Sequence, residues 1–324
     1  MFFGRKILIT GGLGFIGSNL ARRLVELDGQ VTLVDSLIPE YGGNLFNIGD
    51  IERQVKVNIS DVRDEHSMQY LVKGQDYLFN LAGQTSHLDS MHDPYTDLQV
   101  NCRAQLSILE ACRKYNPDIK IVFASTRQIY GKPEYLPVDE KHRIHPVDVN
   151  GIHKMAGERY HILYNDIYGI RSCALRLTNT YGPRMRVRDA RQTFLGVWIR
   201  SMVEGTPFEV WGGQQLRDFT YVDDAVEAFL MAGSKEDANG QVFNLGGESV
   251  INLKDLADLL IEVNGGGTYN IHSFPAERRR IDIGDYFADY ERIHSVLGWV
   301  PQVPLRDGLA RTLAYFHENL SKYL

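Results

Sequence analysis

The stretch Ile7-Leu-Ile-Thr-Gly-Gly-Leu-Gly-Phe-Ile-Gly17 runs from an apolar strand through a glycine turn into a helix. Gly11 allows the tight turn, Gly14 lets the backbone approach a phosphate, and Gly17 lets the helix pack close to the strand. The helix begins near Phe15 and Ile16, where unpaired backbone N–H groups favour an anion. This geometry predicts a site for the pyrophosphate of a dinucleotide.

The residues around this motif agree with that prediction. Lys6 to Thr10 form a short β-rich run, Ser18 to Leu27 form an amphipathic stretch, and Gln30 to Val34 form a second strand that ends in Asp35. The glycine spacing alone would also suit a plain glycine-rich turn. The order of strand, glycine loop, helix, strand and acid is typical of a Rossmann dinucleotide site.

Length and composition set the wider limits. The chain has 324 residues, of which 44% are hydrophobic, enough for a full α/β core and a second lobe. The net charge of -6 gives no general attraction to nucleic acid or to anionic membranes, so neither is expected as a partner. The first strand follows Met1 almost directly and no apolar run approaches membrane-spanning length, which favours a cytoplasmic location. Cysteines without metal spacing, expected in the core, are Cys102, Cys112 and Cys173.

Strands and helices alternate along the first half of the chain, which is typical of βαβ units and a parallel sheet. The predicted strands are Lys6–Thr10, Val31–Asp35, Val55–Asn58, Tyr77–Leu81, Lys120–Ala124 and Ser172–Leu177. The predicted helices lie near Phe15–Leu27, Glu65–Leu71, Tyr95–Tyr115 and Gly151–Tyr168. The fold class is therefore α/β, a Rossmann-type doubly wound parallel sheet with a smaller C-terminal substrate-binding lobe. We expect residues 1–177 to form the dinucleotide-binding domain, with a return to it at about 216–247, and residues 178–324 to form mainly the smaller lobe.

Five motifs carry a resemblance over nearly the whole chain. They are, in order, Thr10-Gly-Gly-Leu-Gly-Phe-Ile-Gly17, Ser125-Thr-Arg-Gln-Ile-Tyr-Gly131, Asn179-Thr-Tyr-Gly-Pro183, Arg217-Asp-Phe-Thr-Tyr-Val-Asp-Asp224 and Leu297-Gly-Trp299. The sequence resembles the extended short-chain dehydrogenase/reductases, in the NAD-dependent nucleotide-sugar epimerase/dehydratase family that includes UDP-glucose 4-epimerase. The resemblance implies an enzyme that binds NAD in the first domain and a nucleotide-diphosphate sugar in the smaller lobe.

Several residues are expected to bind the cofactor. A carboxylate at Asp35 can accept from both ribose hydroxyls of NAD and would repel the extra phosphate of NADP. No Arg or Lys follows it in Ser36-Leu37-Ile38, so NAD is the expected cofactor. Asp35 could instead be a solvated acid, and Asp61 a helix cap. The resemblance places further residues along the cofactor or in a role that orders its site: Asp61, Val62, Leu81, Ala82, Gly83 and Asn101.

The chemical site is expected where the strand Lys120–Ala124 ends. In the resembled family the residue at Thr126 hydrogen-bonds the hydroxyl that is oxidised, although a threonine there could serve strand formation alone. The family's 4,6-dehydratases use an acid and a base, commonly Asp then Glu, at the next two positions. This chain has Arg127 and Gln128, which cannot act as carboxylic acid and base. That argues against a standard 4,6-dehydratase.

The family's Tyr-x-x-x-Lys pair is altered here, because the chain reads Asn150-Gly-Ile-His-Lys154. In the family the lysine binds the nicotinamide ribose and lowers the tyrosine pKa, so that the phenolate can take the proton of the sugar hydroxyl. Asn150 can bond that hydroxyl but cannot accept the proton, whereas Lys154 can still bind the ribose. We hypothesise that His153 takes over proton transfer, since an unperturbed histidine pKa near ~6.5 suits a base. The alternative is a histidine that packs or bonds locally. Tyr130 and Tyr181 are the other candidates for the base, although both match motif tyrosines that are structural in the family.

Cations in the second lobe are expected to hold the substrate phosphates. Asn179 and Arg217 match family positions that contact the nucleotide diphosphate, and a guanidinium suits that task. In the run Glu277-Arg-Arg-Arg280 we favour Arg280, although the run could be a solvated surface. A further basic segment, near the ligand or at the surface, comprises Arg184, Arg186, Arg188 and Arg191. No metal site is expected, because no cluster has metal-ligand spacing.

The helices Tyr95–Tyr115 and Gly151–Tyr168 carry apolar residues on more than one face. In the family they pair across a dimer axis as a four-helix bundle, so a homodimer is expected, unless both helices simply bury against their own sheet. The combined interpretation is an NAD-dependent nucleotide-sugar epimerase that inverts C4 through a transient 4-keto sugar. Dehydration, decarboxylation and C2, C3 or C5 epimerisation stay open, as does a catalytically silent subunit that binds NAD and a nucleotide sugar.

Overall fold

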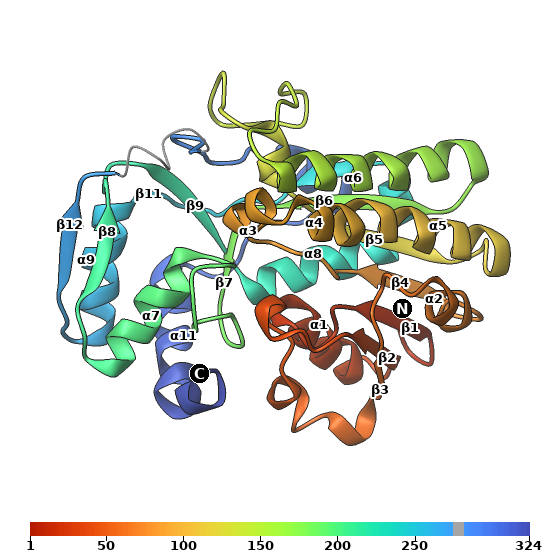
Figure 1. The fold of residues 1–324 in the computed structure, drawn as a ribbon, viewed down its shortest axis with the longest axis horizontal. Coiled ribbons are helices and arrows are strands. Elements are labelled where there is room, and N and C mark those ends of the chain that lie inside the picture. Colours follow the sequence, from red (N-terminus) through yellow and green to blue (C-terminus); the bar gives the residue numbers. More distant parts are fainter. Residues whose placement is uncertain (275–281) are drawn as a thin grey trace.

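A computed structural model describes residues 1–274 and 282–324. Its central sheet has seven parallel strands in the order β10-β6-β5-β4-β1-β2-β3 (Figure 1). The strands are β1 (Lys6–Thr10), β2 (Gln30–Asp35), β3 (Lys56–Ile59), β4 (Tyr77–Asn80), β5 (Lys120–Thr126), β6 (Ser172–Leu177) and β10 (Val242–Asn244). The chain builds outward from β1 in one direction and from β4 in the other, which leaves a crevice at their carboxyl ends. The predicted doubly wound α/β fold is confirmed.

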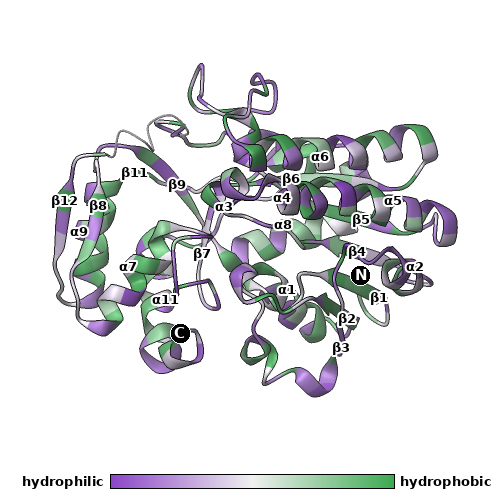
Figure 2. Cartoon of the chain, viewed as in Figure 1, coloured by the Kyte–Doolittle hydropathy of each residue, from purple (hydrophilic) through white to green (hydrophobic). Residues whose placement is uncertain are grey.

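Both faces of this sheet are covered by helices, which explains why its inner strands β1 and β5 are buried and mainly apolar (Figure 2). One face packs against α1 (Phe15–Glu26), α8 (Val222–Ser234) and α10 (Glu291–Leu297). The other packs against α2 (Glu65–Leu71), α5 (Ala104–Tyr115) and α6 (Val149–Tyr168). Side chains such as Leu8, Ile9 and Phe79 are therefore fully buried.

One predicted helix is interrupted. The run Tyr95–Tyr115 forms α4 (Pro94–Leu98), a π-helical turn (Gln99–Arg103) and then α5, and it is preceded by the short α3 (His87–His92). In the π-helical turn the Asn101 amide donates to the Gln84 carbonyl (2.9 Å) and to Asp97 (3.0 Å). These side-chain contacts fix the extra residue of the turn, a feature that is frequent beside functional sites.

The smaller lobe stands beside the sheet (Figure 1). Its helices are α7 (Phe194–Glu204), α9 (Leu253–Asn264) and α11 (Leu305–Asn319), which share a second apolar core. Its strands are β7 (Asn179–Tyr181), β8 (Phe208–Trp211), β9 (Leu216–Tyr221), β11 (Val250–Asn252) and β12 (Tyr269–His272), arranged as β11-β9-β7 and β12-β8. After β9 the chain crosses back, since α8 packs on α1 and β10 pairs with β6. The assignment of dinucleotide binding to residues 1–177 and of substrate binding mainly to residues 178–324 stays a prediction.

Candidate functional site

One cavity follows the carboxyl ends of β1, β2, β4 and β5 and continues to β7 in the smaller lobe. We call it the central cavity. The carboxyl edge of a doubly wound sheet, near the point where the strand order reverses, is where such folds bind ligands. We therefore compare the position of each predicted site residue with the lining of this cavity.

The glycine loop forms one end of the central cavity. α1 begins with Gly14 as its N-cap, so no side chain covers the N–H groups of its first turn. Gly11 has a left-handed φ of +67°, and a Cβ at Gly17 would collide with the Gly11 carbonyl oxygen. The loop residues that line the cavity are Gly11, Gly14, Phe15, Ile16 and Gly17. A pyrophosphate fits against these free donors.

Asp35 lies on the same cavity at the end of β2. Its carboxylate accepts hydrogen bonds from the backbone N–H groups of Leu13 (3.1 Å) and Leu37 (2.9 Å). Burial raises the pKa of Asp35, and these two donors oppose the rise. Asp35 is thus a fixed, partly desolvated acceptor, and not the solvated acid of the alternative interpretation.

Asp61 and Val62 line the cavity next to Asp35. Asp61 is paired with Arg63, with 2.6 Å between Oδ2 and Nη2. The alternative that Asp61 caps the following helix is wrong, because Asp64 accepts from the first-turn N–H groups of α2. The carboxylate of Asp61 therefore stays beside the cavity.

The segment after β4 forms the floor of the cavity through three small or apolar residues, Leu81, Ala82 and Gly83. The Thr10 hydroxyl accepts from the N–H groups of Leu81 (3.1 Å) and Ala82 (3.2 Å), which ties this floor to β1. A Cβ at Gly83 would lie only 3.0 Å from Asn101 Oδ1. Asn101 sits behind the floor and outside the cavity lining, so it can order the site without touching a ligand. The N-terminus of α1, the fixed carboxylate of Asp35 and the floor of small or apolar residues together fit a dinucleotide such as NAD.

The chemical end of the cavity lies between β5 and the first turns of α6. Lys154 is buried there, and its Nζ donates to the carbonyl of Ala124 (2.6 Å). Burial lowers the pKa of Lys154 to about 8, against the opposing charges of Asp97 and Glu158. The predicted residues that the structure brings together on this part of the wall are Thr126, Asn150 and Lys154.

A buried carboxylate, Asp97 of α4, organises the residues behind this wall. Its Oδ2 accepts from the amides of Asn101 and Asn150, both at 3.0 Å, and its Oδ1 lies 2.7 Å from His153 Nδ1. The Asn150 amide also donates to the Gln84 carbonyl (2.8 Å). His153 is outside the cavity lining with its ring held at Asp97. This placement argues against the hypothesis that His153 takes the proton of a substrate, and agrees with the alternative of a locally bonded histidine.

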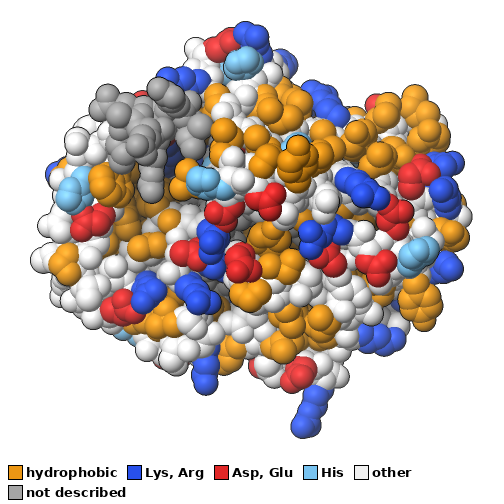
Figure 3. Space-filling view, viewed as in Figure 1, with side chains coloured by type: hydrophobic (Ala, Val, Ile, Leu, Met, Phe, Trp, Pro, Cys, Tyr) orange, Lys and Arg blue, Asp and Glu red, His pale blue; other side chains and the backbone are white. Residues whose placement is uncertain are grey.

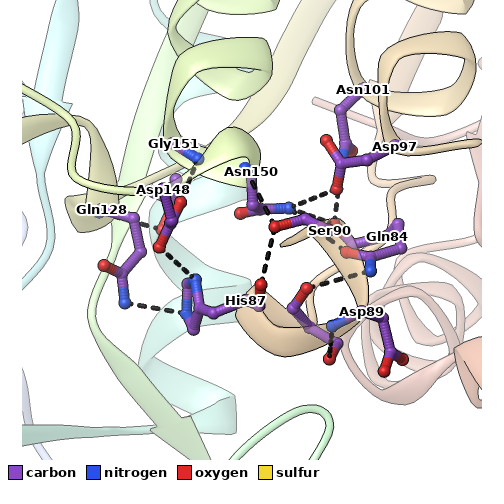
Figure 4. Close-up of polar contacts among 12 residues, drawn as sticks. Gln84, His87, Asp89, Ser90, Asp97, Asn101, Gln128, Asp148, Asn150 and Gly151 are labelled. Atoms are coloured by element: carbon purple, nitrogen blue, oxygen red, sulfur yellow. Dashed lines mark hydrogen bonds and ion pairs between the residues drawn. The ribbon is translucent and has the colours of Figure 1, made fainter. Parts of the chain in front are cut away.

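His87, the first residue of α3, is a cavity residue that no motif indicated. Figure 4 shows its ring between the side chains of Gln128 and Asp148. Its Nε2 lies 2.8 Å from the Gln128 side-chain nitrogen, and its Nδ1 lies 2.9 Å from Asp148 Oδ2. Asp148 is buried, and its other oxygen accepts from the Gly151 N–H (2.6 Å) as the N-cap of α6. No local spacing connects residue 87 with residues 128 and 148, so only the tertiary fold reveals this group.

The smaller lobe closes the far end of the cavity. Asn179 lines it at the start of β7, and its Oδ1 accepts from Arg127 Nη2 (3.0 Å). The Arg127 guanidinium lies 5.1 Å from the centre of the Tyr286 ring, and burial lowers its pKa. Of the predicted basic segment, Arg186 and Arg191 line the cavity. Arg186 is paired with Asp189, and Arg191 with Asp89 and Asp189, so an anionic ligand would share these cations with carboxylates.

Arg217 is placed differently from the prediction. It lies in β9 outside the cavity lining, where its guanidinium donates to the carbonyls of Leu216 and Gly284. Burial lowers the pKa of Arg217 to about 10. A contact between Arg217 and a diphosphate in this cavity is not supported, because the side chain is committed to backbone carbonyls. Arg280 lies outside the described residues, and the other two arginines of the basic segment, Arg184 and Arg188, do not line the cavity.

The sequence matches the NAD dependent epimerase/dehydratase family over residues 7–246. The chain belongs to this family. A putative UDP-glucose 4-epimerase of Methanocaldococcus jannaschii is 33% identical over 315 residues, covering 97% of this chain and 99% of the relative. The structure of UDP-glucose 4-epimerase from Thermotoga maritima with UDP-glucose matches with a TM-score of 0.88 and 31% identity, over 97% of this chain and 99% of that one. The complex of Thermus thermophilus UDP-glucose 4-epimerase with NAD matches with a TM-score of 0.84 and 26% identity, over 96% and 98%.

Membership of the epimerase/dehydratase family confirms the resemblance that the five motifs indicated, and with it NAD as the cofactor. Among residues 1–274 and 282–324, no group of three or more His, Cys, Asp or Glu side chains could hold a metal ion. Within the same ranges, no helix is both long and apolar enough to cross a membrane. Cys112 and Cys173 are buried and Cys102 is partly buried.

Proposed function

We propose that this epimerase/dehydratase family member is an NAD-dependent epimerase that inverts C4 of a nucleotide-diphosphate hexose through a transient 4-keto sugar. The observation that carries the proposal is the continuity of the central cavity from the glycine loop to Thr126, Lys154 and Asn179. A dinucleotide laid from the glycine loop would end at Lys154, and a nucleotide sugar laid from Asn179 would end at Thr126. When bound there, NAD supplies reversible hydride transfer.

Each of these residues has a task that its contacts support. The Lys154 ammonium, held at the Ala124 carbonyl, can bond a hydroxyl of the nicotinamide ribose. The Thr126 hydroxyl ends β5 on the cavity wall and can orient the sugar hydroxyl. Arg186 and Arg191 line the same cavity and can neutralise the substrate diphosphate.

The chemical end lacks the carboxylic acid and base that the family's 4,6-dehydratases use. Within the described cavity wall the carboxylates are Asp35, Glu40 and Asp61, all at the glycine-loop end. Arg127 is bound to Asn179, and Gln128 contacts His87. Neither can protonate a leaving hydroxyl at neutral pH. Return of hydride to C4 is therefore the outcome that this wall supports best.

The test is proton NMR in D2O of the purified protein with NAD and a panel of UDP-, CDP-, GDP- and dTDP-hexoses. The measurement follows product identity and deuterium uptake at each sugar carbon. A matched run without NAD controls for spontaneous exchange.

Inversion at C4 with no deuterium at any carbon is the expected result, because hydride returns directly to C4. Deuterium at C3 or C5 would show that the enzyme enolises the carbon beside the ketone, and the proposal of simple C4 epimerisation would be wrong. Loss of water or carbon dioxide would make the protein a dehydratase or decarboxylase. Tight NAD binding with no change in any sugar would favour the silent subunit.

A further inference from the structure

We propose that His87 is the catalytic residue that takes the proton from the C4 hydroxyl and returns it, with Asp148 holding the imidazole ring. The inference rests on the proposed epimerase function and adds the group that moves the proton. It replaces the earlier hypothesis on His153, whose ring is held at Asp97 behind the cavity wall.

The other groups at the chemical end are less suited to accept that proton at neutral pH. Asn150 has an amide, and its nitrogen is already bound to Gln84 and Asp97. The pKa of Lys154, about 8, leaves it mostly an ammonium, and its Nζ donates to a backbone carbonyl. Arg127 stays protonated, because a guanidinium does not lose its charge in proteins.

The two motif tyrosines, Tyr130 and Tyr181, are also excluded. Tyr130 is fully buried, its hydroxyl donates to Asn244 Oδ1 (2.7 Å), and burial raises its pKa to about 12. Tyr181 is buried as well and donates to the Leu305 carbonyl (3.3 Å). Neither tyrosine lines the central cavity. His87 is therefore the imidazole at this end of the described cavity wall, and a neutral imidazole carries a basic lone pair.

Asp148 gives His87 the orientation that a base needs. The Asp148 side chain is only 2% exposed, whereas that of His87 is 35% exposed. The Asp148 carboxylate lies at the N-terminus of α6, where the helix dipole favours a negative charge. At 2.9 Å from Nδ1 it favours a proton on that nitrogen, although the contact is bent away from ideal hydrogen-bond geometry. The lone pair is then left on Nε2.

The side-chain amide of Gln128 indicates where a substrate hydroxyl would bind. Its side-chain nitrogen lies 2.8 Å from His87 Nε2, so an N–H donor already occupies the direction from which a sugar hydroxyl would donate. Gln128 and His87 both line the cavity with Thr126. A hydroxyl that displaces this amide would face His87 Nε2 on the cavity wall that Thr126 also lines.

The proton balance of the step is simple. As the C4–H bond breaks, the hydrogen leaves with both electrons to the nicotinamide ring, and the C4–O bond becomes a carbonyl. The hydroxyl O–H bond breaks in the same step, its proton bonds to His87 Nε2, and Asp148 stabilises the imidazolium. On the way back the proton returns from Nε2 to the oxygen as hydride reaches the opposite face of C4.

The kinetic test compares His87→Ala with His294→Gln, an exposed histidine of α10, in the presence of NAD and UDP-glucose. We expect His87→Ala to lower kcat by about 100-fold or more, the usual range for loss of a general base. Added imidazole should restore part of the rate, and the Kd for NAD should change by less than about threefold. His294→Gln should behave as wild type. A His87→Ala enzyme that keeps most of its kcat would overturn the proposal.

A second measurement decides the matter without turnover. In NAD-loaded protein labelled with ¹⁵N-histidine, the signals of His87 are assigned by their loss in His87→Gln. At neutral pH we expect a proton on Nδ1 and none on Nε2, and Asp148→Asn should weaken that preference. A proton on Nε2, alone or on both nitrogens, would overturn the proposal. If wild type converts no sugar in the panel, the proposed function fails and this inference falls with it, whereas a proton on Nε2 of an active enzyme overturns this inference alone.

Discussion

At the scale of single residues, Asp35 should set the affinity for NAD. Its carboxylate is fixed by the N–H groups of Leu13 and Leu37 at the end of β2. Asp35→Asn keeps an oxygen for one of these donors but removes the charge that favours a ribose diol. Because a hydrogen bond to a charged group contributes about 1.5–3 kcal/mol, the Kd for NAD should rise by roughly tenfold or more. Fluorescence titration with NAD measures the change.

The matched control for that substitution is Asp64→Asn. Asp64 caps α2 and does not line the central cavity. Its removal should leave the Kd for NAD unchanged. Equal losses in both variants would show that Asp35 acts on the fold and not on the cofactor.

Lys154 should make NAD binding depend on alkaline pH. Burial lowers its pKa from 10.5 to about 8, so the ammonium is present below that pH and is neutralised as the pH rises through it. NAD affinity should therefore be flat at neutral pH and fall as the pH passes about 8. Titration of NAD binding against pH tests this. In Lys154→Met the affinity for NAD should be weak at every pH. If that variant still loses affinity as the pH passes about 8, the titrating group is not Lys154.

The residues of the site differ in how far the sequence could predict them. Asp35, Thr126 and Lys154 sit at strand ends or in a motif, so their spacing already predicted their neighbourhood, and all three line the cavity. His87 begins the short helix α3 and meets Asp148 only after α4, α5 and β5 have folded. Such a contact leaves no periodic signal. Conversely, sequence adjacency to Lys154 made His153 look catalytic, although Asp97 holds it behind the wall.

At the scale of elements, α6 should depend on its N-cap. Asp148 accepts from the Gly151 N–H and is buried. Asp148→Ala should lower the free energy of unfolding by about 0.5–2 kcal/mol, the usual cost of losing a cap. Asp148→Asn keeps an acceptor and should cost much less. Urea denaturation measures both, and equal stability of wild type and Asp148→Ala would show that the cap contributes nothing.

Element boundaries were predictable where apolar period and glycine punctuation agree. The first strand and α2 match the predicted ranges, and β5 runs only two residues further, to Thr126. The π-helical turn within Tyr95–Tyr115 was not predicted, because its cause is tertiary. Asn101 reaches across to Gln84, and a Cβ on Gly157 of α6 would collide with the Asn101 carbonyl.

At the scale of the whole molecule, the exposed side of α4 and α6 is the proposed dimer surface. These helices pack together, and Figure 3 shows hydrophobic side chains gathered over α6. The exposed residues that define this surface are Tyr95 (76%), Leu98 (39%), Leu163 (49%) and Ile167 (65%). Their neighbours Ile108 and Leu109 are buried against the sheet, so burial inside the protomer accounts for only part of the apolar pattern.

We expect light scattering to give the mass of a dimer for wild type. The double substitution Leu163→Asp and Ile167→Asp should give a folded monomer, because it puts two charges into a desolvated contact. Ile271→Asp, at an exposed site of β12, is the control and should stay dimeric. A monomeric wild type would contradict the proposal that this surface forms a dimer.

Hydride transfer is proposed to take place at the junction of the two lobes, and the fate of the C4 hydrogen tests this proposal. The enzyme with NAD is given the nucleotide hexose that it converts, labelled with deuterium at C4, and the product is analysed by NMR and mass spectrometry. Retention of the label at C4 of the inverted product is the predicted result, because the same hydrogen leaves and returns. Loss of the C4 deuterium to water, or its retention in a sugar inverted at another carbon, would contradict the account.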